Sequence, residues 1–278
     1  MQLHISSIKQ FLANSLAEDL GQGGDITSKF LISANKNVDF SISARQNLVL
    51  CGTAIVEYFF NEYSSVKYNF LHKDGDIIDS QSSIIEGKGN ALEILALERT
   101  ILNYLQHLSA VATLTKSYVD IVKDNKAKIC DTRKTIPGLR LLQKYAVTCG
   151  GGNNHRFALD SSILIKDNHI AACGGVKQAM ELAKSRAPHY TKIEIECDNL
   201  EQVKEAVVYK ADIIMLDNMT IANIKSALKI INNTTLIEVS GGINLDNILE
   251  IARMGVDLIS IGKLTNSAPA VDIGLDII

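Results

Sequence analysis

Short apolar runs alternate with amphipathic stretches along the second half of the chain, after Lys126. Runs of this length are typical of strands buried on both faces of a parallel sheet, and the stretches between them have the periodicity of helices. The pattern therefore predicts a strand–helix alternation. The candidate strands are Lys128–Thr132, Ile163–Lys166, Ile193–Cys197, Asp212–Leu216, Leu236–Val239 and Leu258–Ile261.

Two local signals predict where helices of this region begin and end. The sequence Asp198-Asn199-Leu200-Glu201 resembles a capping box, which opens a helix. Gly255 follows a predicted helix over Leu245–Met254 and is expected as its C-cap.

The spacing of three carboxylates predicts how these units are arranged. Glu196, Asp217 and Glu238 each lie at or near the end of a predicted strand and are separated by 21 residues, and one further step reaches Ile259 in the next strand. A fixed period of this kind indicates repeated right-handed βα units. Because the strands are buried and no dinucleotide-binding glycine motif is present, closure into a barrel is favoured, with the active site at the carboxyl ends of the strands.

The first part of the chain, from about Ser6 to Lys88, has a different pattern. Polar and apolar residues alternate over Val38–Ala44, and glycines interrupt the region, as in a small α+β domain with an antiparallel sheet. A long helix is predicted from Ala91 to about Lys123. Its apolar positions include Ile94, Leu97, Ile101, Leu105 and Leu108.

Composition limits the classes of partner. The 278 residues carry a net charge of −3, so neither a nucleic acid nor an anionic membrane is expected, and any anion site must be made by a few cations. No apolar run approaches the roughly 18 residues of a membrane span, and Met1–Ile5 lacks the pattern of a signal peptide. The five cysteines are odd in number and form no CxxC pair, which favours reduced thiols in a cytoplasmic enzyme.

Cations follow the first two predicted strands of the barrel. Arg133 and Lys134 come directly after the first strand and could clamp an anion, although a solvated loop with a surface salt bridge would have the same sequence. His155 and Arg156 follow a triple glycine that permits a close approach of backbone to ligand. Lys166 ends the second strand, where a ligand contact is favoured because an unpaired buried lysine is costly. For His169 a role at a helix start or in packing is nearly as well supported as a ligand contact.

Carboxylates and glycines follow the later strands. Glu194 and Glu196 share one face of their strand, and Asp217 closes the next. Such carboxylates could hold Mg²⁺, bind ribose hydroxyls, stabilise a positive charge on a sugar, or simply balance the nearby cations. The loops after the last two strands contain Ser240-Gly241-Gly242 and Gly262, which suit phosphate binding by backbone N–H groups.

Ordered motifs run through the chain. They are Glu18-Asp19-Leu20-Gly21, Gly24-Asp25-Ile26-Thr27, Glu98-Arg99-Thr100-Ile101-Leu102-Asn103, Asp131-Thr132-Arg133-Lys134-Thr135, Gly151-Gly152-Asn153-Asn154-His155-Arg156, Leu164-Ile165-Lys166-Asp167-Asn168-His169, Ile193-Glu194-Ile195-Glu196, Leu216-Asp217-Asn218-Met219 and Ser240-Gly241-Gly242-Ile243. With these motifs the sequence resembles the quinolinate phosphoribosyltransferase family over nearly its whole length. The resemblance implies decarboxylating transfer of a phosphoribosyl group from phosphoribosyl pyrophosphate to quinolinate. The products would be nicotinate mononucleotide, pyrophosphate and CO₂, in de novo NAD biosynthesis.

The resemblance also implies an architecture. An N-terminal α/β sandwich domain over residues 1–110 would precede an incomplete, six- to seven-stranded TIM-like α/β barrel over residues 111–269, and the tail 270–278 would return to the first domain. Two chains would form a head-to-tail homodimer with shared active sites, and assembly into a hexamer is left open.

By the family pattern, the site combines cations, carboxylates and glycines. The implied substrate-binding residues are Arg99 from the partner chain, Arg133, His155, Arg156 and Lys166 for the substrate carboxylates, Lys134 for the phosphoribosyl side, Glu196 and Asp217 near the ribose, and Ser240, Gly241, Gly242 and Gly262 for the 5′-phosphate. The implied catalytic residues are Lys134, Lys166, Glu196 and Asp217. Mg²⁺ is the implied cofactor, held mostly through the substrate and in part by Glu196 and Asp217.

The sequence departs from the family pattern at two places and leaves other functions to be tested. Asn266 stands where the family commonly has histidine, and the turn Gly21–Gly24 is one residue longer.

A related phosphoribosyltransferase associated with molybdenum transport would share the phosphate site but have another acceptor clamp. A non-catalytic phosphosugar-binding protein would lack some charged residues of the site, and a barrel aldolase would have a lone Schiff-base lysine.

Overall fold

The computed structural model describes residues 3–278 and divides into two compact units. The N-terminal unit contains the chain up to Lys116 together with Ile136–Gly151 and Ser267–Ile278. The barrel unit contains Ser117–Thr135 and Gly152–Asn266. Both units are therefore assembled from segments that are distant in the sequence.

A four-stranded antiparallel sheet forms one part of the N-terminal unit. Its order is β12-β1-β5-β3, where β1 is Asn37–Ala44, β3 is Lys67–Phe70, β5 is Ser83–Asn90 and β12 is Ile273–Ile277. The alternation seen over Val38–Ala44 is confirmed as a strand, paired on one edge with β5 and on the other with β12. The last strand of the chain thus completes a sheet that begins near residue 37. A small second sheet pairs β2 (Leu48–Val49) with β4 (Ile77–Ile78).

Helices supply the rest of the core of this unit. They are the 3-10 turn η1 (Ile5–Ser7) and the helices α1 (Lys9–Leu20), α2 (Ile26–Leu31), α3 (Thr53–Tyr63), α4 (Ala91–Val122) and α5 (Arg140–Cys149). The long helix predicted from residue 91 is confirmed as α4, and its five predicted apolar positions are all buried. Burial of this stripe explains why the helix runs so far without a break. No helix within residues 3–278 combines the length and the apolar character needed to cross a membrane.

Six parallel strands form the sheet of the barrel unit, in the order β6-β11-β10-β9-β8-β7. The strands are β6 (Lys128–Cys130), β7 (Ile163–Ile165), β8 (Ile193–Cys197), β9 (Ile213–Asp217), β10 (Leu236–Ser240) and β11 (Leu258–Ser260), each within two residues of its predicted bounds. Within the described residues β6 and β7 are the two edge strands of this sheet and do not pair with each other. The barrel is therefore incomplete, as expected. One isolated bridge between Cys130 and Asn153 lies beside β6.

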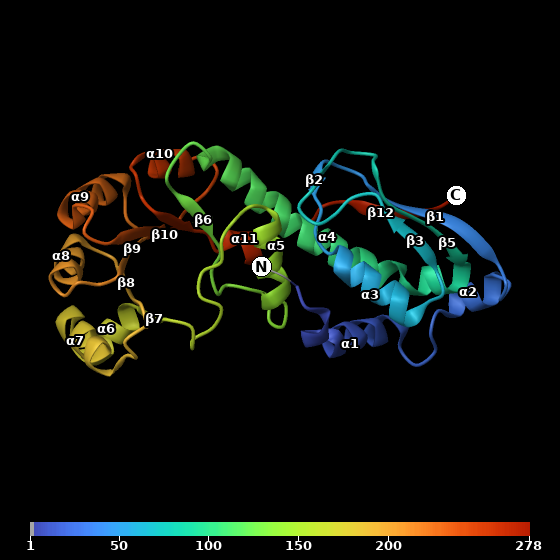
Figure 1. Ribbon diagram of the computed structural model, residues 1–278, viewed down its shortest axis with the longest axis horizontal. Coiled ribbons are helices and arrows are strands. Elements are labelled where there is room, and N and C mark those ends of the chain that lie inside the picture. The colour runs from blue at the N-terminus through green and yellow to red at the C-terminus, as the bar shows by residue number, and fades with distance from the viewer. Residues whose placement is uncertain (1–2) are drawn as a thin grey trace. The chain divides into compact units, whose positions relative to one another are not determined.

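Helices cover the outer side of this curved row of strands (Figure 1). They are α6 (Asp167–Cys173), α7 (Val176–Arg186), α8 (Leu200–Val208), α9 (Ile221–Ile231) and α10 (Ile248–Arg253), with the short α11 (Lys263–Asn266) after β11. The helix start predicted near residue 198 is confirmed, with the Asn199 side chain accepting from the backbone N–H of Gln202. The prediction of a helix from Leu245 was wrong by three residues. Asn244 accepts from the N–H groups of Asp246 and Asn247 instead, and this Asx turn delays the helix.

Candidate active site

A cavity of about 420 Å³ lies in the barrel unit at the carboxyl ends of the strands. All six strands, or the loops after them, contribute to its wall, as the barrel geometry predicts. The cavity therefore gathers most of the charged residues that the sequence singled out. Its lining residues are Thr132, Arg133, Lys134, His155, Arg156, Leu164, Lys166, Glu196, Met215, Asp217, Glu238, Ser240 and Ser260.

Two arginines in this cavity have buried donors without a protein acceptor. The Nε atoms of Arg133 and Arg156 are buried and have no hydrogen-bond partner among the described residues. Arg156 is held by its Nη1, which donates to the carbonyl of Ser162 at 2.9 Å. Burial, and next the charge of Arg133, lower the pKa of Arg156. Because an unsatisfied buried donor is costly, this pair of guanidinium groups indicates an anionic ligand with at least two acceptor groups.

The same cavity also contains an ion pair between a lysine and a glutamate. Lys166 Nζ lies 2.5 Å from Glu196 Oε2, and the Lys166 side chain remains 43% exposed, whereas that of Glu196 is 10% exposed. The lysine thus keeps access to a ligand while its charge is partly balanced. His169 lies outside the cavity lining and accepts at its Nδ1 from the backbone N–H of Lys166 at 2.9 Å. It serves the start of α6, one of the two roles the sequence left open.

The glutamate of this pair also belongs to a cluster of three carboxylates. Oxygen atoms of Glu196, Asp198 and Asp217 lie within 4.8 Å of one another. Burial, followed by the charge of Asp217, raises the pKa of Asp198. A cluster of carboxylate oxygens is the donor set that a hard cation such as Mg²⁺ prefers, so the residues fit the metal that the sequence predicted. Asp198 was missed, because its place before α8 was explained fully by helix capping.

His155 forms part of the wall, and its ring nitrogens face protein atoms. The backbone N–H of Arg156 donates to His155 Nδ1 at 2.7 Å. His155 Nε2 lies 3.2 Å from a Glu194 oxygen and 3.6 Å from a Glu238 oxygen. Two buried carboxylates thus lie at the Nε2 edge of the ring. Because His155 also lines the cavity, binding of the substrate carboxylates by this ring stays a prediction.

Glu238 is the second residue that sequence reasoning did not assign to the site. It is 1% exposed and accepts a hydrogen bond from the hydroxyl of Ser260. Burial, and next the charge of Glu194, raise its pKa to about 7. The 21-residue spacing had placed Glu238 on a strand. Its inward-facing position on that strand was the signal that could have assigned it to the site.

The loop that carries His155 is fixed by a buried aspartate. Asp131 is fully buried and accepts from the Asn154 side-chain amide at 2.6 Å and from the His155 N–H at 2.9 Å. Lys134 is fixed through its backbone, which accepts from the hydroxyl of Thr265 at 2.7 Å and donates to that of Thr132 at 3.0 Å. Cationic groups on both loops are therefore held by their main chains before any ligand binds.

A smaller cavity of about 210 Å³ adjoins the first and shares Thr132, Lys134, Ser240 and Ser260 with it. Its glycines are those that the sequence predicted for phosphate binding, Gly241, Gly242 and Gly262. Gly241 and Gly242 have φ angles of 82° and 65°, and a Cβ on Gly241 would overlap the side chain of Asn218. Only glycine satisfies both conditions at position 241, so this turn of the loop depends on it. Asn266 also lines this cavity.

Arg99 lies in the N-terminal unit. It is on α4, its side chain is 57% exposed, and its guanidinium lies 3.9 Å from Glu98. It does not line either of these cavities.

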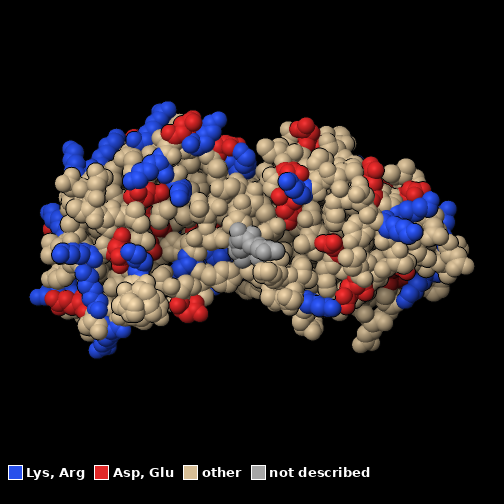
Figure 2. Space-filling model, in the orientation of Figure 1, with Lys and Arg blue, Asp and Glu red and all other residues tan. Residues whose placement is uncertain are grey.

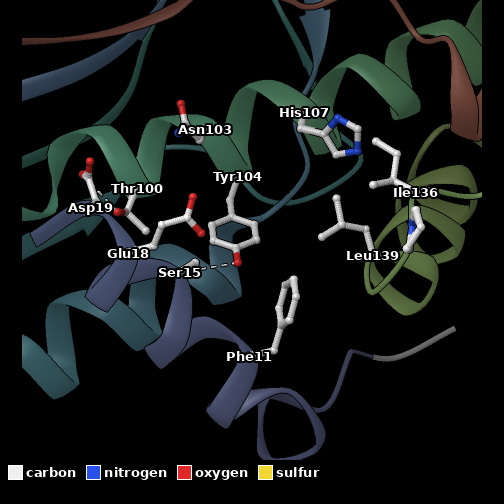
Figure 3. Close-up of a pocket in the computed structure, with 11 residues that line it drawn as sticks. Phe11, Ser15, Glu18, Asp19, Thr100, Asn103, Tyr104, His107, Ile136 and Leu139 are labelled. Atoms are coloured by element: carbon white, nitrogen blue, oxygen red, sulfur yellow. Dashed lines mark hydrogen bonds between the residues drawn. The ribbon is translucent and has the colours of Figure 1, made fainter. Parts of the chain in front are cut away.

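The N-terminal unit contains a cavity of its own, about 440 Å³ in volume, between α1, α4 and the segment 136–139 (Figure 3). Glu18 and Asp19 lie at one end, and Phe11, Ile136 and Leu139 form apolar walls. The Tyr104 hydroxyl donates to Ser15 across it at 3.0 Å. Among the described residues, its lining includes no lysine or arginine and therefore has no counterpart to the guanidinium pair of the barrel unit.

Comparison with known proteins also gives two parts, although their bounds differ from those of the two compact units. Residues 25–109 match the family model of the quinolinate phosphoribosyl transferase N-terminal domain, and residues 111–276 match that of the C-terminal domain. The chain is 45% identical to the probable nicotinate-nucleotide pyrophosphorylase (carboxylating) of Methanocaldococcus jannaschii, over 97% of this chain and 96% of the relative. It is 40% identical to the Bacillus subtilis protein of the same name, over 97% and 93% of the two chains.

The fold is shared with solved structures as well. The crystal structure of nicotinate-nucleotide pyrophosphorylase from Ehrlichia chaffeensis superposes with a TM-score of 0.94 at 46% identity and covers all of both chains. The structure from Francisella tularensis superposes with a TM-score of 0.94 at 38% identity, over 100% of this chain and 98% of the other. The chain belongs to the quinolinate phosphoribosyltransferase family.

Proposed function

We propose that this protein transfers the phosphoribosyl group of phosphoribosyl pyrophosphate to quinolinate, with loss of CO₂, to form nicotinate mononucleotide. The observation that carries the proposal is the pair of buried, unsatisfied Nε donors of Arg133 and Arg156. They lie in one cavity with Lys134 and Lys166, beside a glycine-lined cavity suited to a phosphate. A pyridine dicarboxylate beside a sugar phosphate would satisfy all of these groups.

The two arginines bind and orient the acceptor. Each guanidinium offers a fork of donors that matches a carboxylate, which a lysine cannot reproduce. Burial, and next the charge of Arg133, lower the pKa of Arg156, so a dianion that lies between the two guanidinium groups would offset both effects. Binding of quinolinate therefore relieves an unfavourable interaction as well as forming new bonds. His155 supports this clamp through the N–H of Arg156.

The phosphoribosyl donor occupies the other half of the site. The backbone of Ser240, Gly241, Gly242 and Gly262 would hold the 5′-phosphate. Glu196, Asp198 and Asp217, whose oxygen atoms lie within 4.8 Å of one another, would contact the ribose hydroxyls and hold Mg²⁺. Mg²⁺, when bound, supplies charge neutralisation for the departing pyrophosphate.

The chemistry then requires orientation and charge rather than a covalent intermediate. The ring nitrogen of quinolinate attacks the anomeric carbon as pyrophosphate leaves, and carboxylates nearby stabilise the positive charge that develops on the sugar. The alkylated ring is cationic, so it stabilises the carbanion left when the adjacent carboxylate departs as CO₂. A proton then replaces CO₂ on that carbon. Lys134 and Lys166 are the two cations that could assist this step.

The direct test incubates the purified protein with quinolinate, phosphoribosyl pyrophosphate and Mg²⁺ and measures nicotinate mononucleotide and CO₂ together. Equal amounts of both products are expected. Nicotinic acid serves as the matched acceptor, because it lacks one of the two carboxylates and should be a poor substrate. Product from nicotinic acid but none from quinolinate would refute the proposed acceptor.

We also propose that the active form is a cytoplasmic homodimer in which Arg99 completes the site of the partner chain. Its exposed position on α4 and its absence from the cavities of the barrel unit support this role. Mixing inactive Arg99→Ala and Arg133→Ala chains should restore up to about a quarter of the wild-type activity, because random pairing places one intact site in each hybrid dimer. No recovery after demonstrated subunit exchange would exclude the shared site.

A further inference from the structure

Two of the five cysteines lie together in the N-terminal unit, although 98 positions separate them in the sequence. Cys51 precedes α3 and is fully buried, and Cys149 ends α5 and is partly exposed. Their sulfur atoms and a carboxylate oxygen of Asp74 lie within 4.8 Å of one another. The sequence had given no reason to pair them, and the proposed reaction uses neither.

Asp74 anchors this cluster and leaves little room for a metal ion. Its Oδ1 accepts from the backbone N–H groups of Gly52 at 3.0 Å and Thr53 at 2.9 Å. Its Oδ2 accepts from the hydroxyl of Tyr145 at 2.8 Å. Both carboxylate oxygens already accept hydrogen bonds, and two thiols are too few ligands for a structural zinc site. Any reaction at this cluster is therefore expected to involve the two sulfur atoms.

The two thiols are unequal. Burial, in the first place, raises the pKa of Cys51. The pKa of Cys149 is lowered, chiefly because the Cys51 thiol donates a hydrogen bond to it. The thiolate is the reactive form, and Cys149 is also the more exposed residue of the two. A low-pKa, accessible cysteine beside a second thiol is the arrangement of a reversible redox pair.

We propose that Cys51 and Cys149 form a reversible intramolecular disulfide when the protein meets hydrogen peroxide. The Cys149 thiolate attacks one peroxide oxygen, so that an S–O bond forms, the O–O bond breaks and hydroxide leaves as water after taking a proton. The Cys51 sulfur, losing its proton, then attacks the Cys149 sulfur, and the S–O bond breaks to release a second water. Two thiols and one peroxide give one disulfide and two waters, with two electrons passing to the peroxide.

The bond would join two segments that are already fixed. Gly150, next to Cys149, lies against α4 so closely that a Cβ there would overlap the carbonyl of Ala112. The disulfide would tie the end of α5 to the start of α3 and restrict the unfolded chain over a long loop. We therefore expect the unfolding midpoint to rise by about 5–10 °C on oxidation and to return after reduction with dithiothreitol.

The test oxidises the intact protein with a small excess of hydrogen peroxide, removes the peroxide and counts thiols in denaturant. The count should fall from five to three, and non-reducing peptide mapping should find the peptides of Cys51 and Cys149 linked. Cys149→Ser should keep its four thiols under the same treatment. Cys173→Ser is the matched control, because Cys173 is a partly exposed cysteine outside the cluster, and this variant should still lose two.

Other outcomes overturn the proposal. An unchanged thiol count in the native chain, a disulfide that involves Cys173, or a bond between chains would each show that the pair is not the redox site. Over-oxidation of Cys149 without a bond to Cys51 would do the same. The assay needs no quinolinate, so its result is independent of the proposed reaction.

Discussion

The two units contain cavities of nearly equal volume and opposite chemistry. That of the N-terminal unit, about 440 Å³, has two carboxylates and apolar walls, and that of the barrel unit, about 420 Å³, has two arginines, two lysines and three carboxylates. Size alone does not distinguish them. The distinguishing feature is the buried guanidinium pair, whose Nε donors lack a protein partner, whereas the Tyr104 hydroxyl and the Thr100 hydroxyl in the other cavity donate to Ser15 and Asp19.

The contrast has a structural cause. In the barrel unit, six parallel strands end at one rim, so polar residues from separate loops converge there. In the N-terminal unit, the cavity lies between faces of two helices and one short segment, which offers fewer directions from which charged groups can meet. On the face shown in Figure 2, Lys and Arg side chains are interspersed with acidic ones.

Removing one arginine should have the largest effect. Arg156→Ala is expected to lower kcat/KM for quinolinate about 10³-fold, because it removes a charge-assisted fork that a buried carboxylate needs. Arg156→Lys should recover part of the loss, since it keeps the charge but not the fork. Lys204→Ala, exposed on α8, is the matched control and should retain wild-type kinetics. A change of less than threefold in the kcat/KM of Arg156→Ala would show that the guanidinium pair does not bind quinolinate, and that it does not distinguish the two cavities in function.

The next effect concerns Glu238, one of the two carboxylates beside His155. The pKa of Glu238 in the folded protein is about 7, above its value in the unfolded chain. The folded state therefore holds an extra proton between pH 4.5 and 7, and the stability that Glu238 contributes at low pH is lost as the pH rises through 7. The free energy of unfolding should fall by up to about 3 kcal/mol over this range. Denaturant titrations of Glu238→Gln should show a flatter profile, and an unchanged slope would mean that Glu238 does not titrate there.

A smaller effect is expected in the glycine loop. Gly241→Ala should raise the KM for phosphoribosyl pyrophosphate about tenfold, because the left-handed φ and the contact with Asn218 force the loop to shift. The KM for quinolinate should change little. Gly255→Ala also strains a left-handed glycine, but away from the site and without a steric contact, so it is the control for general destabilisation. Equal effects on both substrates would argue against a separate phosphate subsite.

The sequence predicted elements better than it predicted side-chain directions. All six strands of the barrel unit were found because each is an apolar run between polar boundaries, and that signal is local. Arg133, Lys166 and Asp217 could be placed at one rim because parallel strands share a polarity. The ring of His155 could not be oriented in this way. Its direction depends on Glu194 and Glu238, which lie 39 and 83 positions away in the sequence and act only once the sheet has formed.

The same limit explains what was missed. Asp198 had a sufficient local explanation as part of a helix start, so its approach to Glu196 and Asp217 could not be seen. Cys51 and Cys149 lie in segments that meet only because Ile136–Gly151 packs with the N-terminal unit. Nothing in the composition of either segment indicates that return. Contacts between distant segments carry the chemistry in both cases, and a single sequence does not encode them in a periodic pattern.

The smallest effect should come from the N-terminal cavity. Tyr104→Phe removes the hydroxyl that donates to Ser15 and leaves the ring, which packs near Phe59, in place. The loss of one partly buried hydrogen bond between neutral groups should lower the free energy of unfolding by about 1 kcal/mol. Activity should remain within twofold of wild type, because His107 is the one basic side chain among the described residues that line this cavity, and burial lowers its pKa. Denaturant unfolding and steady-state kinetics on the same preparation separate the two quantities. A large loss of activity with little loss of stability would show that the acidic cavity takes part in the reaction. Both cavities, and not that of the barrel unit alone, would then serve the activity.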